Sequence, residues 1–178
     1  MKTTTELVEE TAEEAARPAD KCDLRHALGA YATGVVIVST CDASGEPVGI
    51  TVNSFASLSL DPPLVLWSLN AQSPSRRHFD AAPYFAINVL TVDQVSLSRR
   101  FATRRAQKFE DVPTRQGLGG VPLFEGSAAI FQCRRVARHE GGDHVIYIGE
   151  VQAHEHFPDR APLLFHAGHY RHLGAAID

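Results

Sequence analysis

The chain has 178 residues, of which 44% are hydrophobic and 21% charged, so it is long enough for one domain of ordinary size with a proper core. Its formal net charge of −4 lacks the basic balance that nucleic-acid-binding domains usually show. No apolar run approaches the roughly 18–20 residues of a membrane span, and the N-terminus lacks the apolar core of a signal peptide. We therefore expect a cytoplasmic protein that binds neither nucleic acid nor a membrane.

The N-terminal part of the chain is acidic and has almost no large apolar side chains. Within residues 1–20 the acidic side chains include Glu6, Glu9, Glu10, Glu13 and Glu14. This composition predicts a mobile or loosely helical extension that contributes little to a core. The remaining residues, 21–178, are expected to form the globular domain.

A short helix and a hairpin are predicted next. Asp23 can cap a helix that runs to about Tyr31, and Gly34 ends it. The β-branched run VVIVST, residues 35–40, predicts a buried strand. The turn-like segment CDASGEP separates this strand from a second one that begins at Val48, so we expect the two to pair as an antiparallel hairpin.

The stretch from Gly49 to Leu66, GITVNSFASLSLDPPLVL, is the most informative part of the sequence. It begins with an apolar/polar alternation, continues through several serines, and meets a turn at Asp61-Pro62-Pro63 before the apolar strand over residues 64–69. A bend rich in hydroxyls suits the polar chain and phosphate of a cofactor, because both need many short neutral hydrogen bonds. An ordinary β-turn built from Ser, Asn and Pro is the alternative.

Further helices and strands follow in the rest of the chain. Ser73 can cap a short helix with Pro74 in its first turn, and Asp93 can cap another. Strand-like runs cover residues 84–90, 127–140, 144–156 and 162–173. The two longest runs are joined by Gly141-Gly142-Asp143, a turn that suits a hairpin needing positive φ.

These elements together indicate the fold class. Six or seven strands with three short helices between them favour a closed or partly closed antiparallel barrel over a doubly wound sheet, in which helices alternate regularly with strands. No G-x-G-x-x-G segment follows a predicted strand, so a Rossmann domain is not supported. We therefore predict a mainly β fold with a few short α-helices.

Two groups of ionisable side chains are candidates for a site. Arg99, Arg100, Arg104, Arg105 and Lys108 form the densest basic cluster of an otherwise acidic protein. They are either a solvated helix end or ligands for the phosphates of a dinucleotide. His144 opens an apolar strand after the tight turn. It either caps that turn or donates a hydrogen bond or proton beside a redox ring, since imidazoles can titrate near neutral pH.

Metal and nucleophile chemistry has weaker support in the sequence. The cysteines Cys22, Cys41 and Cys133 are odd in number and lack a C-x-x-C spacing, which is typical of free thiols in a reducing cytoplasm. His154 and His156 share one strand face, but no carboxylate–histidine motif surrounds them. Neither a G-x-S-x-G elbow nor a P-loop occurs. We expect no metal site, with a histidine-metal β-barrel enzyme as an alternative.

Several segments, taken in order, resemble the flavin reductase-like domain family. They are ATGVVIVST, GITVNSFASLSLDPPLVLWSL, FAINVLTVDQVSLSRRFA, EGGDHVIYIGEV and PLLFHAGHYRHL, and they extend from about Leu24 to Leu173. The most specific pieces are TVNSFASLSLDPPLV and GDHVIYIGEV. The resemblance implies a split β-barrel of the Greek-key, FMN-binding type that forms a homodimer and binds FMN or FAD at the rim of the interface.

The same resemblance implies roles for individual residues. Thr51, Val52, Asn53 and Ser54 would meet the flavin ring and ribityl chain, and Ser57, Leu58 and Ser59 would lie along the ribityl-phosphate portion. Asn70 and Ser73 would be near the phosphate or an adenylate. His144 would be the catalytic group beside the nicotinamide or the isoalloxazine, and Tyr170 matches an aromatic residue near it. Arg105, together with Arg104 and Lys108, is a candidate phosphate contact.

The function implied by the resemblance is flavin reduction. NADH or NADPH would supply a hydride to FMN or FAD, and the reduced flavin would pass to a separate flavin-dependent monooxygenase. The two cofactors carry out the hydride transfer, so the protein must hold them together and needs no obligatory acid or base. A flavin-binding protein of the same barrel without reductase activity is the alternative. The residues do not separate FMN from FAD, or NADH from NADPH.

Overall fold

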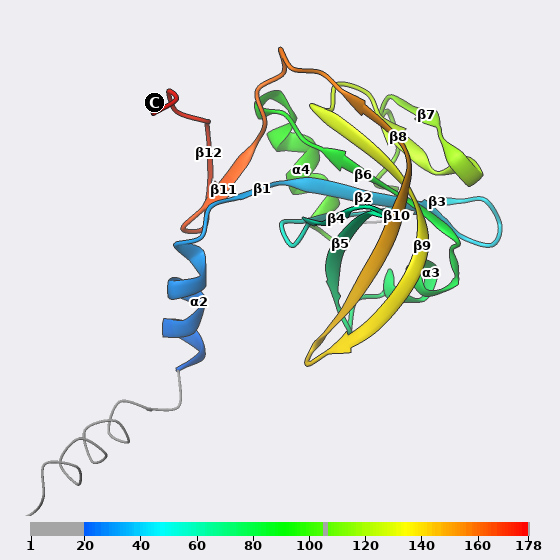
Figure 1. The fold of residues 1–178 in the computed structure, drawn as a ribbon, viewed down its shortest axis with the longest axis horizontal. Coiled ribbons are helices and arrows are strands. Elements are labelled where there is room, and N and C mark those ends of the chain that lie inside the picture. The colour runs from blue at the N-terminus through cyan, green and yellow to red at the C-terminus, as the bar shows by residue number, and fades with distance from the viewer. Residues whose placement is uncertain (1–19, 105–106, 178) are drawn as a thin grey trace, which may run out of the picture.

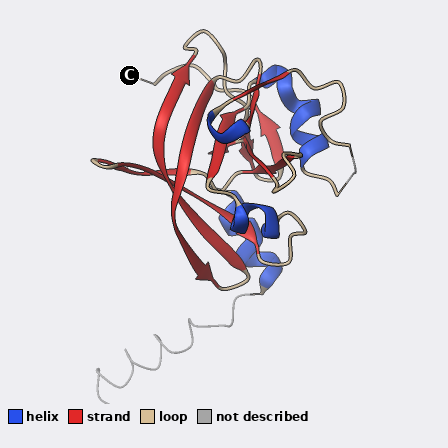
Figure 2. Cartoon of the chain, turned by 90° about the vertical axis from the view of Figure 1, so that its right-hand side faces the viewer, coloured by secondary structure: helices blue, strands red, loops and turns tan. Residues whose placement is uncertain are grey.

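Antiparallel strands are the main elements of the fold, which a computed structural model describes for residues 20–104 and 107–177 (Figures 1 and 2). The helices are α2 (Lys21–Gly29), α3 (Arg76–Ala81) and α4 (Val95–Phe101), with 3-10 turns η1 (Val92–Gln94) and η2 (Leu118–Gly120). The strands are β1 (Thr33–Gly34), β2 (Val36–Cys41), β3 (Pro47–Val52), β4 (Ala56–Leu60), β5 (Pro63–Asn70), β6 (Tyr84–Val89), β7 (Thr114–Gln116), β8 (Pro122–Phe124), β9 (Ala129–Gly141), β10 (His144–His156), β11 (Leu164–His166) and β12 (His169–Arg171). The predicted mainly β fold is confirmed. Of the acidic extension expected over residues 1–20, all but Asp20 lies outside the described residues.

A seven-stranded sheet forms the body of the molecule. Its strand order is β3-β2-β6-β9-β10-β5-β4, and every neighbouring pair is antiparallel. The sheet is strongly curled (Figure 2). Strand β3 at one end of the strand order is in contact with β5 near the other end. Smaller sheets, β1-β11-β12 and β7-β8, flank it. This curled arrangement confirms the split β-barrel that the sequence predicts.

The two longest strands confirm the predicted hairpin. β9 and β10 pair antiparallel along most of their length, and Gly142 in the turn has φ of +65°. Further along β10, Gly149 lies against the ring of Phe85, where a Cβ atom would come within 2.4 Å of Cζ. A side chain at this position would push β10 away from the core, because atoms cannot approach so closely.

The stretch between β3 and β5 holds one strand more than predicted. A single bend was expected there, but residues Ala56–Leu60 form β4, which pairs with β5 and is the last strand of the sheet on that side. The register shifts between Ser57 and Ser59, so Leu58 bulges from the ladder. The alternating ASLSL segment can form this strand because backbone bonds to one neighbour suffice at a sheet edge.

The first helix begins and ends earlier than predicted. Asp20, rather than Asp23, caps α2, and its carboxylate accepts a hydrogen bond from the amide of Cys22 (3.2 Å). The helix ends at Gly29, two residues before the predicted end at about Tyr31. An acidic cap satisfies an otherwise unpaired amide of the first turn, and either aspartate has the chemistry to do so.

The caps of the other helices are also displaced by a few residues. Ser75 precedes α3, whereas Ser73, the predicted cap, accepts a hydrogen bond from the amide of Ser75 (3.3 Å). Thr91, rather than Asp93, starts η1, and it forms a capping box with Gln94. The Gln94 side chain returns to the Thr91 amide (3.1 Å), which closes the box.

Aromatic rings fill the core beneath the sheet. Trp67 is fully buried and stacks on Tyr147 at 4.8 Å between ring centroids. Phe79 of α3 and Phe85 of β6 meet the same indole edge-on, at 4.9 and 5.9 Å. The burial of such large rings supplies much of the hydrophobic stabilisation of a domain of this size.

A network of charges closes one side of this core. Asp80 accepts hydrogen bonds from the Tyr147 hydroxyl (2.7 Å), Arg138 Nε (2.8 Å) and Arg76 Nε (3.2 Å). Burial raises the pKa of Asp80, but the bonds from Tyr147 and Arg138 outweigh it, so the pKa lies below its ordinary value. Burial and the bond to Asp80 raise the pKa of Tyr147 well above its usual range.

Helix α2 lies away from the barrel (Figure 1). It forms an arm that is joined to the barrel through β1, and β1 pairs with β11. None of its residues is buried, and Leu24, Leu28 and the nearby Tyr31 are 48%, 67% and 78% exposed. Neighbouring apolar side chains exposed to this degree are typical of a surface that another element covers. Across the described part of the chain, no helix has the length and apolar character needed to cross a membrane.

Candidate functional site

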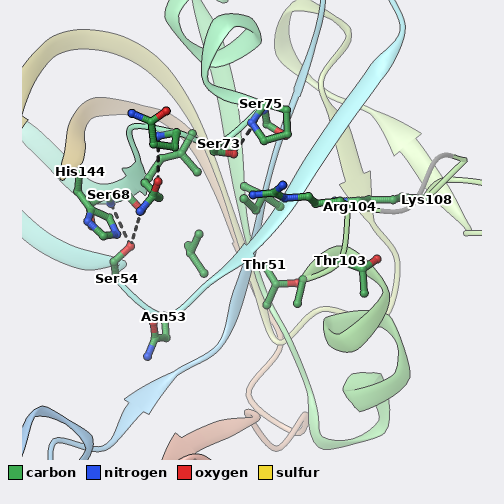
Figure 3. A pocket seen from close by; sticks show the side chains of 17 residues that line it. Thr51, Asn53, Ser54, Ser68, Ser73, Ser75, Thr103, Arg104, Lys108 and His144 are labelled. Atoms are coloured by element: carbon green, nitrogen blue, oxygen red, sulfur yellow. Dashed lines mark hydrogen bonds between the residues drawn. The ribbon is translucent and has the colours of Figure 1, made fainter. Parts of the chain in front are cut away.

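A cavity of about 490 Å³ opens where β3 and β5 end (Figure 3). Its wall consists of Ile50, Thr51, Val52, Asn53, Ser54, Ser68, Leu69, Asn70, Gln72, Ser73, Pro74, Ser75, Ala102, Thr103, Arg104, Lys108 and His144. None of these described lining residues is acidic, whereas Arg104 and Lys108 carry positive charge. The cavity therefore suits a ligand with negative charge and many hydrogen-bond acceptors.

The ends of β3 and β5 form a neutral, polar wall. β3 is the last strand in the sheet order, so one edge of its backbone has no strand partner. Ser54 Oγ donates to the carbonyl of Ser68 (2.8 Å) and accepts from its amide (3.0 Å), which ties the two strand ends together. Thr51 Oγ1 donates to the carbonyl of Ser98 in α4 (2.7 Å). These bonds hold hydroxyl and backbone groups at fixed positions around the opening.

The loop from Asn70 to Ser75 forms a second wall. Asn70 Oδ1 accepts from the amide of Gln72 (2.9 Å), and the Asn70 carbonyl accepts from the amide of Ser73 (2.9 Å). Ser73 Oγ in turn accepts from the amide of Ser75. Figure 3 shows Ser73 and Ser75 side by side at the cavity. Successive turns of this kind bring several short polar groups to one surface.

The cations lie at the end of the cavity opposite His144 (Figure 3). The Lys108 ammonium is half-buried and donates to the carbonyl of Phe101 (3.2 Å). Burial lowers the pKa of Lys108, because the charged amine loses contact with water. A bound phosphate would reverse this effect, since it supplies an opposite charge and strong acceptors. Arg104 extends toward the cavity beside Lys108.

His144 marks the other end of the cavity. Its Nδ1 lies 2.7 Å from Asp143 Oδ1, and this hydrogen bond lowers the pKa of the Asp143 carboxyl. The carbonyl of Asp143 also accepts from the amide of Ala71, which joins the β9–β10 turn to the second wall (2.9 Å). With Nδ1 engaged, Nε2 is the nitrogen that remains for a ligand. The imidazole is therefore oriented at the rim before any ligand binds.

The cavity brings together most of the residues singled out in the sequence. Thr51, Val52, Asn53, Ser54, Asn70, Ser73 and His144 line it, although 93 positions separate the first from the last. The cationic residues Arg104 and Lys108 line it as well. Their proposed contacts with a flavin stay predictions, because the geometry places the residues and not the ligand.

Other residues singled out in the sequence lie elsewhere. Ser57, Leu58 and Ser59 belong to the edge strand β4 and do not line the cavity. Tyr170 is also outside the lining, but its hydroxyl lies 2.9 Å from Ser98 Oγ, and the Ser98 carbonyl accepts from a cavity residue, Thr51. Arg105 lies outside the described residues. The roles expected for all five residues remain predictions.

Sequence reasoning missed part of the wall. The lining residues not singled out for a ligand are Ile50, Ser68, Leu69, Gln72, Pro74, Ser75, Ala102 and Thr103. Ser68 had a usable signal, because it follows the buried Trp67 in β5 and strand side chains alternate between the two faces. Ala102 and Thr103 follow α4, and their approach to β3 depends on packing between elements far apart in the sequence.

The cysteines and histidines of the described residues were considered as metal ligands and as nucleophiles. No group of three or more His, Cys, Asp or Glu side chains there could hold a metal ion. The three cysteines are free thiols. Burial raises the pKa of Cys133 to about 12, so its nucleophilic thiolate is scarce at neutral pH.

Comparison with known proteins gives consistent matches. A family model described as Flavin reductase like domain matches residues 28–174. A relative named FMN reductase (NADH), from Agrobacterium fabrum, is 49% identical over 144 residues, which is 81% of each chain. The reductase subunit of a flavin-dependent monooxygenase from Rhodococcus jostii is 38% identical over 156 residues, covering 88% of this chain and 80% of that one.

Solved structures show the same similarity in three dimensions. The NADH:FAD oxidoreductase of Streptomyces globisporus, in complex with NAD and FAD fragments, has a TM-score of 0.85 and 36% identity, covering 91% of this chain and 98% of that one. A putative oxidoreductase from Sinorhizobium meliloti has a TM-score of 0.83 and 43% identity over 85% of this chain. The chain spans 53% of the length of that second protein.

Proposed function

Because the chain belongs to the flavin reductase like domain family, we propose that it is an NADH-dependent flavin reductase whose cavity at the ends of β3 and β5 binds FMN or FAD. Two relatives, one named FMN reductase (NADH) and the other NADH:FAD oxidoreductase, support this reaction. The observation that carries the site assignment is the composition of the wall. Neutral donors lie toward His144, cations lie at the other end, and no described lining residue is acidic.

A flavin fits this pattern in one orientation. Its ring carries neutral hydrogen-bonding edges, and its chain ends in a phosphate with two negative charges near neutral pH. We therefore place the ring toward Asn53, Ser54 and His144 and the phosphate toward Arg104 and Lys108. The reverse orientation would leave the phosphate without a cation and Lys108 without an anion, and both would cost free energy in a partly buried site.

The side chains of this protein bind the flavin and the nicotinamide and orient them, and they do not supply a reactive group. When bound, the flavin accepts a hydride from the nicotinamide of NADH. Ser54 keeps the two strand ends at a fixed distance, so the ring contacts are preorganised. Backbone donors on the free edge of β3 stabilise negative charge on a ligand that lies against them. His144, held by Asp143, offers Nε2 at the opening where a nicotinamide would enter.

The relatives also support a place for the protein in a larger system. The match to a monooxygenase reductase subunit supports transfer of reduced flavin to a separate flavin-dependent monooxygenase. A site that opens to solvent suits a flavin that must leave after reduction. Free thiols and a nicotinamide donor are typical of a cytoplasmic enzyme, and we expect that location.

We also expect the protein to be a homodimer, because none of the described residues of the same chain covers the apolar side chains of the arm that carries α2. Leu24, Leu28 and Tyr31 would be buried if the arm packed against a second copy. Light scattering on the wild-type protein should give the mass of a dimer, and Leu28→Glu should shift it toward the monomer. A change at Leu60, which is 93% exposed on β4, serves as the control and should leave the mass unaltered.

The reductase assignment is tested by steady-state oxidation of NADH and NADPH, each with FMN and with FAD. We expect rapid oxidation of NADH that depends on added flavin. Absence of NADH oxidation with both flavins would contradict the assignment. Tight flavin binding without turnover would support instead a flavin carrier that uses the same barrel.

A further inference from the structure

Lys108, the half-buried cation of the flavin cavity, lies on a turn over residues 107–111 between α4 and β7. Gln107 and Asp111 in this turn have φ of +57° and +56°, in the left-handed region that residues other than glycine rarely adopt. Such a backbone persists only where the surrounding structure holds it. The position of Lys108 therefore depends on contacts from outside the turn.

Arg100 of α4 supplies two of these contacts. Its Nη2 donates to the carbonyl of Gln107 (3.1 Å) and to the carbonyl of Glu110 (2.5 Å), which lie on either side of Lys108 in the chain. The Glu110 amide also donates to the Gln107 carbonyl (3.4 Å), so both acceptors belong to one closed turn. A guanidinium can hold two acceptors at once, because its N–H groups have fixed directions.

The residue that follows Arg100 holds the other end of Lys108. The ammonium donates to the carbonyl of Phe101 (3.2 Å), and the ring of Phe109 packs edge-on against the Phe101 ring at 4.9 Å between centroids. The last two residues of α4 thus fix both the backbone and the ammonium of Lys108. An ammonium has three donors, so the bond to Phe101 leaves donors for a phosphate.

Arg100 itself is outside the wall of the flavin cavity. It is half-buried and lines a separate cavity of about 280 Å³, together with Asp111 and Glu125 among others. Its Nη2 carries two N–H donors, and each has a carbonyl of the turn as its acceptor. The geometry therefore gives Arg100 an influence on the flavin cavity through Lys108 and not through a contact with the ligand.

We propose that Arg100 is a positioning residue for flavin binding, because its bonds to the Gln107 and Glu110 carbonyls keep the Lys108 ammonium where the flavin phosphate binds. The inference rests on the proposed flavin site, from which it takes the position of the phosphate. Without these two bonds, the turn has other conformations open to it, and Lys108 is in place for only part of the time. The apparent affinity for a flavin that carries a phosphate falls in proportion to that fraction.

Equilibrium titration with FMN and with riboflavin, which lacks the phosphate, tests this role without turnover. Arg100→Ala should weaken FMN binding about fivefold and leave riboflavin binding nearly unaltered, whereas a general loss of structure would weaken both. In a Lys108→Ala background, Arg100→Ala should cause no further loss, because the cation that it positions is absent. Arg99→Ala is the control, since it removes the same charge from a guanidinium that lies over the Tyr170 ring (5.7 Å). It should leave the affinity for FMN unaltered.

Arg100→Lys separates the geometry of the guanidinium from its charge, and it guards against misfolding of the alanine variant. An ammonium keeps the charge but lacks the planar fork that holds two carbonyls, so FMN should bind nearly as weakly as to Arg100→Ala. Wild-type affinity for FMN in Arg100→Lys, or equal losses for both flavins in both variants, would overturn the role.

The double variant supplies the third way to contradict the role. A fivefold loss of FMN affinity on Arg100→Ala that persists in the Lys108→Ala background would show that Arg100 acts independently of Lys108. These results leave the flavin site and the reductase assignment standing. Equal affinities of the wild-type protein for FMN and riboflavin would instead contradict the phosphate position in the proposed site, and the positioning role with it.

Discussion

Two adjacent residues of strand β5, Trp67 and Ser68, belong to two regions that differ in composition, the aromatic core and the polar wall of the cavity. Trp67 is fully buried among aromatic rings, and every neighbour of its ring is part of the chain itself. Ser68 faces the cavity, where Ser54 bonds its backbone and much of the surrounding wall is polar. The core is complete within one chain, whereas the cavity wall keeps donors and cations for a ligand. Substitutions should therefore separate stability from binding.

The largest effect is expected in the core. Trp67→Ala removes the ring that contacts Tyr147, Phe79 and Phe85, and it should lower the free energy of unfolding by about 3–5 kcal/mol. Urea unfolding followed by circular dichroism measures this loss, since the chain has a single tryptophan and its fluorescence disappears with it. Leu60→Ala on β4 is the control, and a change of similar size there would contradict the assignment of Trp67 to the core.

A smaller, pH-dependent effect is expected at the charge network. Asp80→Asn weakens the bonds from Tyr147 and Arg138 and should cost about 2 kcal/mol at neutral pH. Folding lowers the pKa of Asp80. The contribution of its charge to the free energy of unfolding is therefore fully present above the ordinary pKa of 3.8, and it is lost as the pH falls through the lowered pKa.

The pH dependence distinguishes this network from a purely steric role. The stability difference between wild type and Asp80→Asn should stay constant from neutral pH down to the ordinary carboxyl pKa and shrink in more acidic solution. Asp159→Asn, at an exposed aspartate, is the matched control. A difference that does not depend on pH would show that the Asp80 charge has no part in stability.

On the cavity side, Lys108→Ala should change binding more than folding. Loss of one charge-assisted bond to phosphate should weaken FMN binding about tenfold and leave riboflavin binding nearly unaltered. Fluorescence titration with both flavins measures the contrast, and Arg25→Ala, in the exposed helix α2, is the control cation. Equal weakening for FMN and riboflavin would place the phosphate elsewhere.

The smallest effect is expected at His144. Hydride transfer needs no acid or base, so His144→Ala removes one hydrogen bond at the opening and should slow NADH oxidation about fivefold. Flavin affinity should change less than the rate. His139→Ala on β9 is the control, because His139 lies outside the cavity wall. An unchanged rate in His144→Ala would remove the imidazole from the reaction.

Local and long-range interactions also differ in how well they could be predicted from the sequence. The β9–β10 hairpin was predicted correctly, because Gly141-Gly142-Asp143 and its flanking runs are local signals. Strand β4, between β3 and β5, was not predicted. Its ASLSL segment has few residues that favour strands, and it pairs with β5 through its backbone. A strand at a sheet edge depends on its neighbour more than on its own residues.

The site shows the same division between local and distant signals. His144 and the serine-rich strand end carry signals in their own segments, and the structure brings them to one cavity. The bond from Tyr147 to Asp80 joins residues 67 positions apart, and the bond from Thr51 to Ser98 joins residues 47 apart. Contacts of this kind depend on how distant elements pack, so a single sequence contains no pattern that reveals them.

A crystal structure of the protein soaked with FMN tests the central claim most directly. The account predicts electron density for the ring beside Ser54 and His144 and for the phosphate beside Lys108. Density along β4 at Ser57–Ser59, with the cavity at the ends of β3 and β5 left open, would contradict it.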